Sequence, residues 1–291
     1  MRIEYTREEL ESLRDERYYR TASLRAHTEE QALAFVNQVG FCFLFGEKGV
    51  EIPTLWGAVV GSRRPVPRSN RDPDIGRAWT WKDSLPAKGS VLYGRLLRGK
   101  PMLVSLEMLP TFYALSPNYG DLEDYLLQYE EGKLSVEAKN VYEALLNEGA
   151  LATSRLRQVA GISGGGANAR RFDRAIAELQ TELKITKVGI SDSNRWGYAY
   201  VYDLFVRRFP DVPEAAREIS SDRAMTTLLE RYLRNVVAIE EGAAKRLFRW
   251  DPWEWERTLE RMRESGTLAE DVYIEGAKGA CLALASPSPS T

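Results

Sequence analysis

Cationic side chains follow one face of a helix that the sequence predicts between residues 168 and 183. Its apolar residues recur at helical spacing on one stripe: Phe172, Ala175, Ile176, Leu179 and Leu183. At about 100° per residue, the opposite stripe holds Arg170, Arg174 and Thr181, roughly 140° to 200° from Phe172. Arginine binds phosphates and base edges. Arg170, Arg171 and Arg174 are therefore the first candidates for DNA contacts, with Thr181 beside them.

The segments around this helix are typical of a winged helix-turn-helix module. Two helices are expected before it, and two β-rich segments follow it, ITKVGI and GYAYVY, joined by SDSNRW as a wing. In such modules the third helix enters the major groove. Arg195 at the wing tip is expected to reach the phosphate backbone or the minor groove, with Trp196 as a hinge or packing residue. The alternative is a module used only for protein contact.

The distribution of charge favours one basic face, although the net charge is only -2. Residues 61–100 hold ten Lys and Arg against three Asp and Glu, and residues 151–210 hold ten against five. Residues 101–150 hold two against nine. A basic face is the usual footprint of nucleic-acid binding. The loop SRRPVPRSNR could line a DNA channel or lie solvated, and its candidate contacts are Arg63, Arg64 and Arg68.

The N-terminal part predicts two capped helices, because Thr6 precedes Glu9 and Thr28 precedes Gln31 at capping-box spacing. Residues 41–120 then read as an irregular, proline-rich segment. Within it Trp79 and Trp81 alternate as on a strand, and we expect core or rim residues there rather than base-stacking platforms.

Residues 222–285 predict a second winged helix. A helix is expected through Tyr232, another near residues 240–248, and a third after the capping sequence Asp251-Pro252-Trp253-Glu254. Two strand-like stretches, LAEDVYIEG and GACLALA, would complete it. The outward face of the third helix mixes Arg257 and Arg261 with glutamates. We therefore expect a structural or dimerising module, which makes a homodimer conceivable.

Composition bounds the remaining possibilities. With 44% apolar and 28% charged residues the chain is typical of a globular protein. It shows no long apolar run and no signal peptide, so a cytoplasmic protein without a membrane partner is expected. Cys42 and Cys281 are expected to be buried reduced thiols. The single histidine, His27, argues against a metal site. GISGGGAN lacks the GK[ST] ending of a phosphate loop, and no cofactor is expected.

These elements together predict an α+β fold of tandem winged-helix modules with an irregular basic middle segment. The expected regions are a helical and irregular basic region at 1–130, a DNA-binding winged helix at 131–210, a second winged helix at 211–285 and a disordered tail at 286–291.

The order of these parts resembles the AlkZ/YcaQ-like family of winged-helix DNA glycosylases. The resemblance runs from about residue 28 to 285, on these segments: FVNQVGFCFLF, LWGAVVG, KGSVLYGRLLRGKP, RRFDRAIAEL to GYAYVYDLF, RYLRNVVAIEEGAAKRLFRW and WERTLERM. It implies a protein that acts on alkylated bases in duplex DNA. Members carry a catalytic glutamine, an apolar residue and a second polar residue, often glutamine. The matching place here lies near Phe43-Leu44-Phe45, and the nearest glutamines are Gln31 and Gln38.

This departure predicts damage recognition with weak or no base excision. If excision persists, a carboxylate must stabilise the sugar cation or act as a base. Glu107 and Asp83 are the candidates, because apolar neighbours could raise their pKa values. Alternatively, Asp83 pairs with Lys82 or caps a helix, and Glu107 is a buried acid with satisfied hydrogen bonds. Two rival functions stay open. One is a transcriptional regulator that dimerises through 211–285, and the other is an interaction module that uses the acidic stretch 121–148.

Overall fold

The N-terminal helices begin at the capping residues of the sequence. The computed structural model describes residues 2–68, 71–191 and 198–285. The Thr6 hydroxyl accepts from the Glu9 backbone N–H at 3.2 Å, and the Glu9 carboxylate accepts from the Thr6 backbone N–H at 2.9 Å. Thr28 and Gln31 form the same reciprocal pair. Both predicted capping boxes are therefore confirmed, at the starts of α1 (Arg7–Arg17) and α2 (Glu29–Val39).

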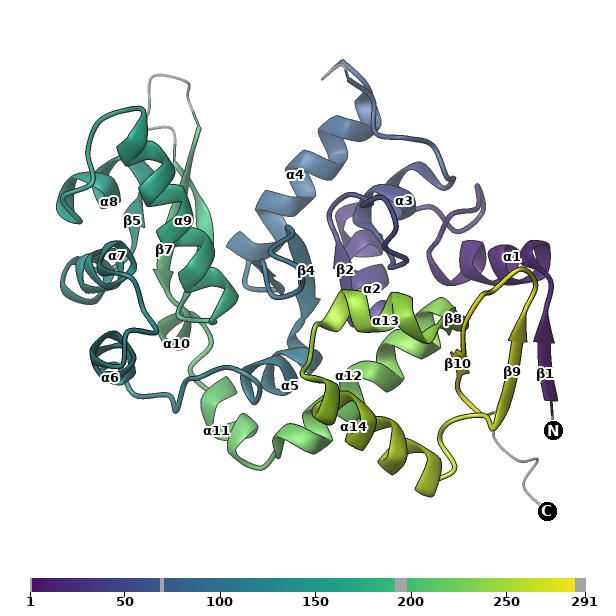
Figure 1. Ribbon diagram of the computed structural model, residues 1–291. Helices are drawn as coiled ribbons and strands as arrows, with labels where there is room; N and C mark the ends of the chain where they lie inside the picture. Colours follow the sequence, from purple (N-terminus) through teal and green to yellow (C-terminus); the bar gives the residue numbers. More distant parts are fainter. Residues whose placement is uncertain (1, 69–70, 192–197, 286–291) are drawn as a thin grey trace. The chain divides into compact units, whose positions relative to one another are not determined.

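The chain divides into two compact units, the first made of residues 2–78 with 220–285 and the second of residues 79–219 (Figure 1). The first unit joins both ends of the chain, because β1 (Arg2–Tyr5) pairs in parallel with β9 (Asp271–Ile274). The buried Arg14 guanidinium also donates to the carbonyl oxygens of Val236 and Ala238, at 3.0 and 2.7 Å. The sequence predicts these two ends in separate regions, since nothing local signals their pairing.

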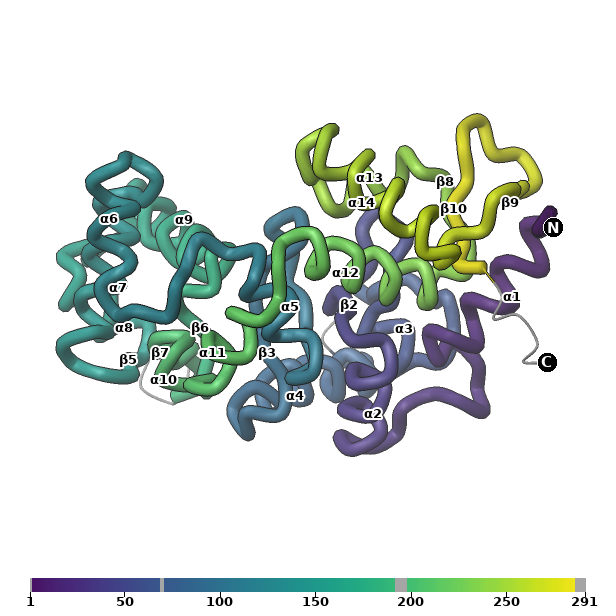
Figure 2. The backbone as a smooth tube through the Cα atoms, turned by 90° about the horizontal axis from the view of Figure 1, so that it is seen from below, coloured from purple at the N-terminus to yellow at the C-terminus, as the bar shows by residue number. Residues whose placement is uncertain are grey.

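Three helices and two short strands accompany β9 in the C-terminal part of the first unit. These elements are α12 (Ser221–Val236), β8 (Ala238–Glu240), α13 (Glu241–Phe248), α14 (Pro252–Glu264) and β10 (Cys281–Ala283). In the tube view of Figure 2, α14 lies beside α12. The two predicted strand-like stretches meet at an antiparallel bridge between Leu268 and Leu284, while β10 also pairs with β8 and β9 pairs with the N-terminal strand β1. The ladder partners of both named strands thus lie far away in sequence.

The other elements of the first unit come from its N-terminal segment. They are β2 (Phe41–Phe43), α3 (Leu55–Val60) and the start of α4 (Pro73–Ala87). Trp79 and Trp81 lie on α4, so the predicted strand at this place is wrong. Two residues apart, side chains on a helix point in nearly opposite directions, as they do on a strand. Trp79 is 43% exposed and Trp81 is buried, which fits either pattern.

The second unit is built around a three-stranded antiparallel sheet in the order β5-β7-β6. Three helices precede or interrupt its strands, as the sequence predicts: α7 (Val136–Glu148), α8 (Thr153–Val159) and α9 (Ala167–Thr181). The strands are β5 (Leu151–Ala152), β6 (Ile185–Ser191) and β7 (Ala199–Leu204). The remaining elements are β3 (Val91–Gly94), β4 (Met102–Ser105), a 3-10 turn at Leu106–Met108, α5 (Leu109–Tyr113), α6 (Asp124–Glu130), α10 (Phe205–Arg208) and α11 (Val212–Arg217).

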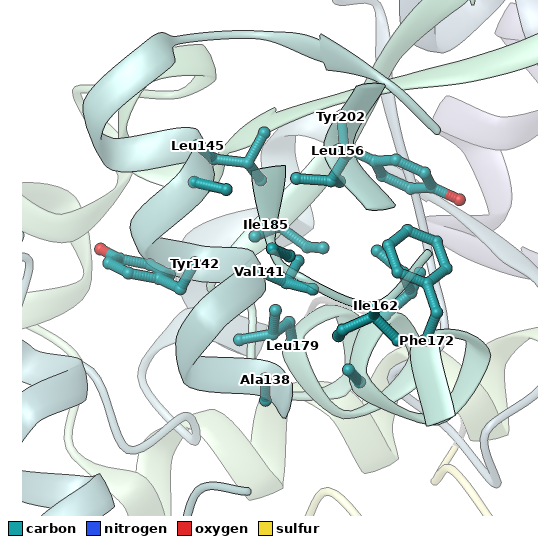
Figure 3. Close-up of a cluster of buried hydrophobic side chains, with 14 of the residues drawn as sticks. Ala138, Val141, Tyr142, Leu145, Leu156, Ile162, Phe172, Leu179, Ile185 and Tyr202 are labelled. Carbon is teal, nitrogen blue, oxygen red and sulfur yellow. The ribbon is translucent and has the colours of Figure 1, made fainter. Parts of the chain in front are cut away.

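An apolar core holds α7, α8 and α9 against this sheet. Figure 3 shows Val141 and Leu145 of α7 packed with Leu156, Phe172 and other side chains at its centre. All are nearly inaccessible to solvent. Burial of an aliphatic or aromatic side chain of this size contributes roughly 1.5 to 3 kcal/mol relative to exposure. The core thereby fixes which face of α9 turns outward.

Two further sequence expectations concern membranes and thiols. No helix in the described ranges is long and apolar enough to cross a membrane. Cys42 is buried and Cys281 is half-buried, and neither takes part in a disulfide in the described structure. The expectation of two buried thiols is therefore met at Cys42 and corrected at Cys281, which lies on the short edge strand β10.

Candidate nucleic-acid interface

The outward face of α9 presents three arginines at its N-terminal end. Gly166 caps the helix with a φ of 60°, a left-handed conformation that favours glycine. Arg170, Arg171 and Arg174 are all exposed in the following two turns. Arg171 has a distant ion pair with Glu137 at 3.8 Å, and Arg174 Nε lies 3.4 Å from the Arg170 carbonyl oxygen. These guanidinium groups therefore retain most of their hydrogen-bonding capacity for a ligand.

Thr181 lies at the other end of the same face and is already engaged. Its hydroxyl donates to the Ala177 carbonyl oxygen at 2.8 Å, and the carbonyl oxygen of Arg95, which follows β3, lies 3.3 Å away. Thr181 therefore has less capacity for a new contact than the three arginines.

Two of the loop arginines hold the first unit together. Arg63 binds Asp15 through two hydrogen bonds of 2.9 and 2.7 Å. Arg64 pairs with Asp72 and Asp74, at 3.1 and 2.9 Å. Their charges are therefore largely compensated.

Three further residues were predicted near the DNA: Arg68, Arg195 and Trp196. Arg68 is exposed. Arg195 and Trp196 lie outside the described residues.

Asp83 lies in a cluster of cationic and aromatic side chains within the second unit. Its Oδ1 atom accepts from Lys82 Nζ at 2.7 Å and also from Lys187 Nζ. Its Oδ2 atom accepts from the Tyr198 hydroxyl. The Lys82 ammonium also donates to the hydroxyls of Tyr198 and Tyr200, at 3.0 and 3.2 Å. Residues from α4, from β6 and from the position directly before β7 thus meet at one carboxylate.

Aromatic rings complete the surroundings of the two lysines. Lys82 Nζ lies 4.3 Å from the centroid of the Trp79 ring. Lys187 Nζ lies 3.9 Å from the centroid of Tyr200 and 5.0 Å from that of Tyr93. Ring faces attract cations. Two ammonium groups can therefore stay buried with a single carboxylate.

The electrostatics of Asp83 differ from the sequence expectation. Burial alone would raise its pKa, but hydrogen bonds from Lys187, Lys82 and Tyr198 outweigh burial and lower the pKa. The expectation of a raised pKa is wrong, and the alternative of a pair with Lys82 is observed. A general base is most effective when its pKa lies near the pH at which the enzyme works. The pKa of Asp83 is lowered by its two ammonium partners, so this carboxylate is a weak general base.

Burial lowers the pKa of Lys187 to about 8, and the neighbouring Lys82 charge adds to this effect, while Asp83 opposes it. Neither Lys187 nor Tyr198 was predicted from the sequence as part of this cluster. The one local signal was a lysine inside the strand-like segment ITKVGI, and Tyr198 gave none.

Glu107 does not lie in the apolar surroundings that the sequence predicts. The residue is exposed in the 3-10 turn Leu106–Met108, although its neighbour Met108 is buried. Apolar neighbours in sequence therefore do not enclose this carboxylate, and the expected apolar pocket is absent around this residue.

The aromatic run at 41–45 is part of the core. Phe41 and Phe43 are fully buried, and Leu44 is nearly so. Only Phe45 is half-buried, with its ring centroid 6.3 Å from that of Trp56. The buried phenylalanine rings offer no surface for a flipped base and no group that could activate water. The nearest glutamines have structural contacts, since Gln31 caps α2 and Gln38 accepts from the Tyr19 hydroxyl at 2.8 Å.

Comparisons with known proteins agree with this architecture. The fold is similar to that of the Streptomyces sahachiroi DNA glycosylase AlkZ, with a TM-score of 0.59 and 14% sequence identity, covering 97% of this chain and 70% of that chain. None of the curated proteins matches the chain. Residues 26–249 match the family described as AlkZ related, over more than half of the sequence. The chain therefore belongs to the AlkZ-related family.

Proposed function

We propose that this protein binds duplex DNA through residues 131–210, arranged as a winged helix with α9 in the major groove. The observation that carries the proposal is the exposed set Arg170, Arg171 and Arg174 on the outward face of the third helix. An α-helix fits the major groove, and arginine reaches both phosphates and guanine edges there. The strands β6 and β7 pair antiparallel after α9, as the strands of a wing do.

We further propose a role in recognising damaged DNA with weak or no base excision. Family membership and the similar fold of a Streptomyces DNA glycosylase support a repair-related role. Two observations argue against efficient excision. The run at 41–45 places buried aromatic rings where the resembling enzymes carry polar ones, and Asp83 is neutralised by two lysines.

The second winged-helix module, residues 211–285, has a structural or dimerising role in this proposal. On α14 both outward arginines, Arg257 and Arg261, pair with Asp222, the latter at 3.0 Å. An arginine that is held by a carboxylate of its own unit has less attraction for phosphate. This module therefore supplies the matched control for α9.

Fluorescence anisotropy with a labelled duplex tests the proposal. The Arg170→Ala/Arg174→Ala variant should bind at least tenfold more weakly, as two phosphate or base contacts are lost, and circular dichroism should stay native because both side chains point away from the core. Arg257→Ala/Arg261→Ala removes the same charge and should retain most of the affinity. Equal losses of duplex affinity in both variants would refute the proposal that α9 is the DNA-binding helix. Strong preference for one sequence among unrelated duplexes would instead favour a transcriptional regulator.

A protein-interaction role is the second candidate. Its support is a set of exposed apolar side chains on α6, within the acidic stretch: Leu126, Leu127 and Tyr129. Exposed apolar patches mark contact surfaces. Absence of any DNA affinity in the anisotropy experiment would favour this candidate over DNA binding.

A further inference from the structure

A cavity of about 590 Å³ opens beside the Asp83 cluster, within the second unit. One side is a face of α4 with the spacing i, i+3, i+4 and i+7, made of Thr80, Asp83, Ser84 and Ala87. The other side is formed by Ile190 of β6 and Tyr198, and Trp79 completes the wall. This volume is typical of small-molecule sites, which range over roughly 300 to 1,000 Å³.

The rim of the cavity is aromatic and accessible. Trp79 is 43% exposed and Tyr198 is 37% exposed. Ile190 adds an apolar contact on the β6 side and is 48% exposed. Large flat side chains at the mouth of a pocket suit a flat ring, because stacking on aromatic rings requires no hydrogen bonds from the ligand.

Two polar groups of the cavity wall retain hydrogen-bonding capacity. A carboxylate has about four acceptor positions. Lys82 and Lys187 occupy two on Asp83 Oδ1, and Tyr198 occupies one on Oδ2, so Oδ2 can accept one more hydrogen bond. The Ser84 Oγ atom is buried and has no hydrogen-bond partner among the described residues. A buried hydroxyl without a partner is costly, and a ligand N–H group would satisfy it.

The charge of the cluster restricts the ligand further. Lys82 and Lys187 are fully or almost fully buried, and neither lines the cavity. An anion would therefore meet the Asp83 carboxylate first. A cation would meet the same carboxylate, but the charge of Asp83 is already more than compensated by its pairs with Lys82 and Lys187. An uncharged ring with N–H donors avoids both penalties.

We propose that this cavity binds an uncharged nucleobase with an exocyclic amino group, its ring against Trp79 and Tyr198 and its amino hydrogens donated to Asp83 and Ser84. The inference rests on the proposed DNA-binding function, with an extrahelical nucleotide as the source of the base. A free nucleoside presents the same chemistry, so the experiment separates the two sources.

Two pairs of ligands test the proposal on the full chain. Calorimetric titration compares guanosine with inosine, which lacks only the amino group. Anisotropy compares a duplex with one unpaired dG, the same duplex with unpaired deoxyinosine, and the fully paired duplex. Guanosine should bind more tightly than inosine, and the unpaired dG duplex at least about fivefold more tightly than the paired one, from one stacked base. Nucleoside binding without preference for unpaired dG would identify free nucleosides as the source.

Two variants locate the binding site. Trp79→Ala should weaken guanosine binding by about tenfold and leave affinity for the paired duplex unchanged. Because Trp79 also contacts Lys82, its thermal unfolding must be compared with the parent protein. Ser84→Ala breaks no hydrogen bond of the described structure and should bring the guanosine-to-inosine affinity ratio close to one. Retention of that ratio in Ser84→Ala would overturn the assignment of the amino contact.

The outcomes also separate this inference from the proposed function. Arg170→Ala/Arg174→Ala should lose duplex affinity and keep guanosine affinity. Guanosine binding without any duplex binding would overturn the DNA-binding proposal and support the cavity. Salt-sensitive duplex binding with neither guanosine binding nor preference for unpaired dG would overturn the cavity inference alone.

Discussion

Replacing Lys187 by methionine should change how stability depends on pH. The side chain is 1% exposed, and burial together with Lys82 lowers its pKa from 10.5 to about 8. Between these two values the unfolded chain binds more protons than the folded one, so the free energy of unfolding rises with pH. At 1.36 kcal/mol per pKa unit, the full shift lowers the free energy of unfolding by about 3 kcal/mol at low pH. Roughly 2 kcal/mol of this loss of stability disappears as the pH rises from 7 to 10.

Other groups of the cluster do not produce this rise. The pKa of Asp83 is lowered, so its carboxylate is ionised throughout the range. Burial raises the pKa values of Tyr93 and Tyr198, and these tyrosines lower stability above pH 10, because the unfolded chain loses their protons first. Burial also lowers the pKa of Lys184, which produces a rise of the same sign. The part of the rise that disappears in Lys187→Met is therefore the part assigned to Lys187.

Urea unfolding at pH 7, 8, 9 and 10 measures the effect. The free energy of unfolding of Lys187→Met, relative to the parent protein, should fall by about 2 kcal/mol from pH 7 to pH 10. Lys133→Met is the control. The surface ion pair with Glu131 raises the pKa of Lys133, so the effect of Lys133 on the pH dependence of stability is opposite in sign to that of Lys187. Parallel pH profiles for the parent protein and Lys187→Met would refute the reasoning.

Three further predictions concern stability and chemistry. Asp83→Asn should lower the free energy of unfolding by about 3 to 5 kcal/mol, because it leaves two buried ammonium groups without a carboxylate; an unchanged urea midpoint would contradict this. Thr28→Ala should cost about 1 kcal/mol through loss of the α2 cap, measured in the same way, and a cost near zero would contradict it. Duplexes with N7- or N3-alkylated purines should yield few alkali-sensitive abasic sites, and turnover well above buffer controls would contradict weak excision.

Local signals predicted much of the fold. The capping boxes at Thr6 and Thr28 and the N-cap at Asp251 act within one turn of helix, so neighbouring residues suffice to locate them. The apolar stripe of α9 likewise predicted which arginines are exposed. The short strands β5 and β8 were not predicted, because segments of two or three residues show no periodicity.

Long-range pairing explains what the sequence could not provide. Asp83 meets Lys187 across 104 positions and Tyr198 across 115, and no local pattern encodes either contact. The pKa of Asp83 depends on these partners, so its predicted direction was wrong. Glu107 shows the converse error, since apolar sequence neighbours do not guarantee burial at a turn.

The salt dependence of duplex binding tests the central claim most directly. Each neutralised phosphate contributes about -0.9 to the slope of log affinity against log salt concentration. The parent protein should show a steep negative slope. If Arg170 and Arg174 both contact phosphates, their replacement by alanine should make the slope shallower by roughly 1.8, two such contributions. A flat slope for the parent protein, or an unchanged slope in the double variant, would contradict DNA binding through α9.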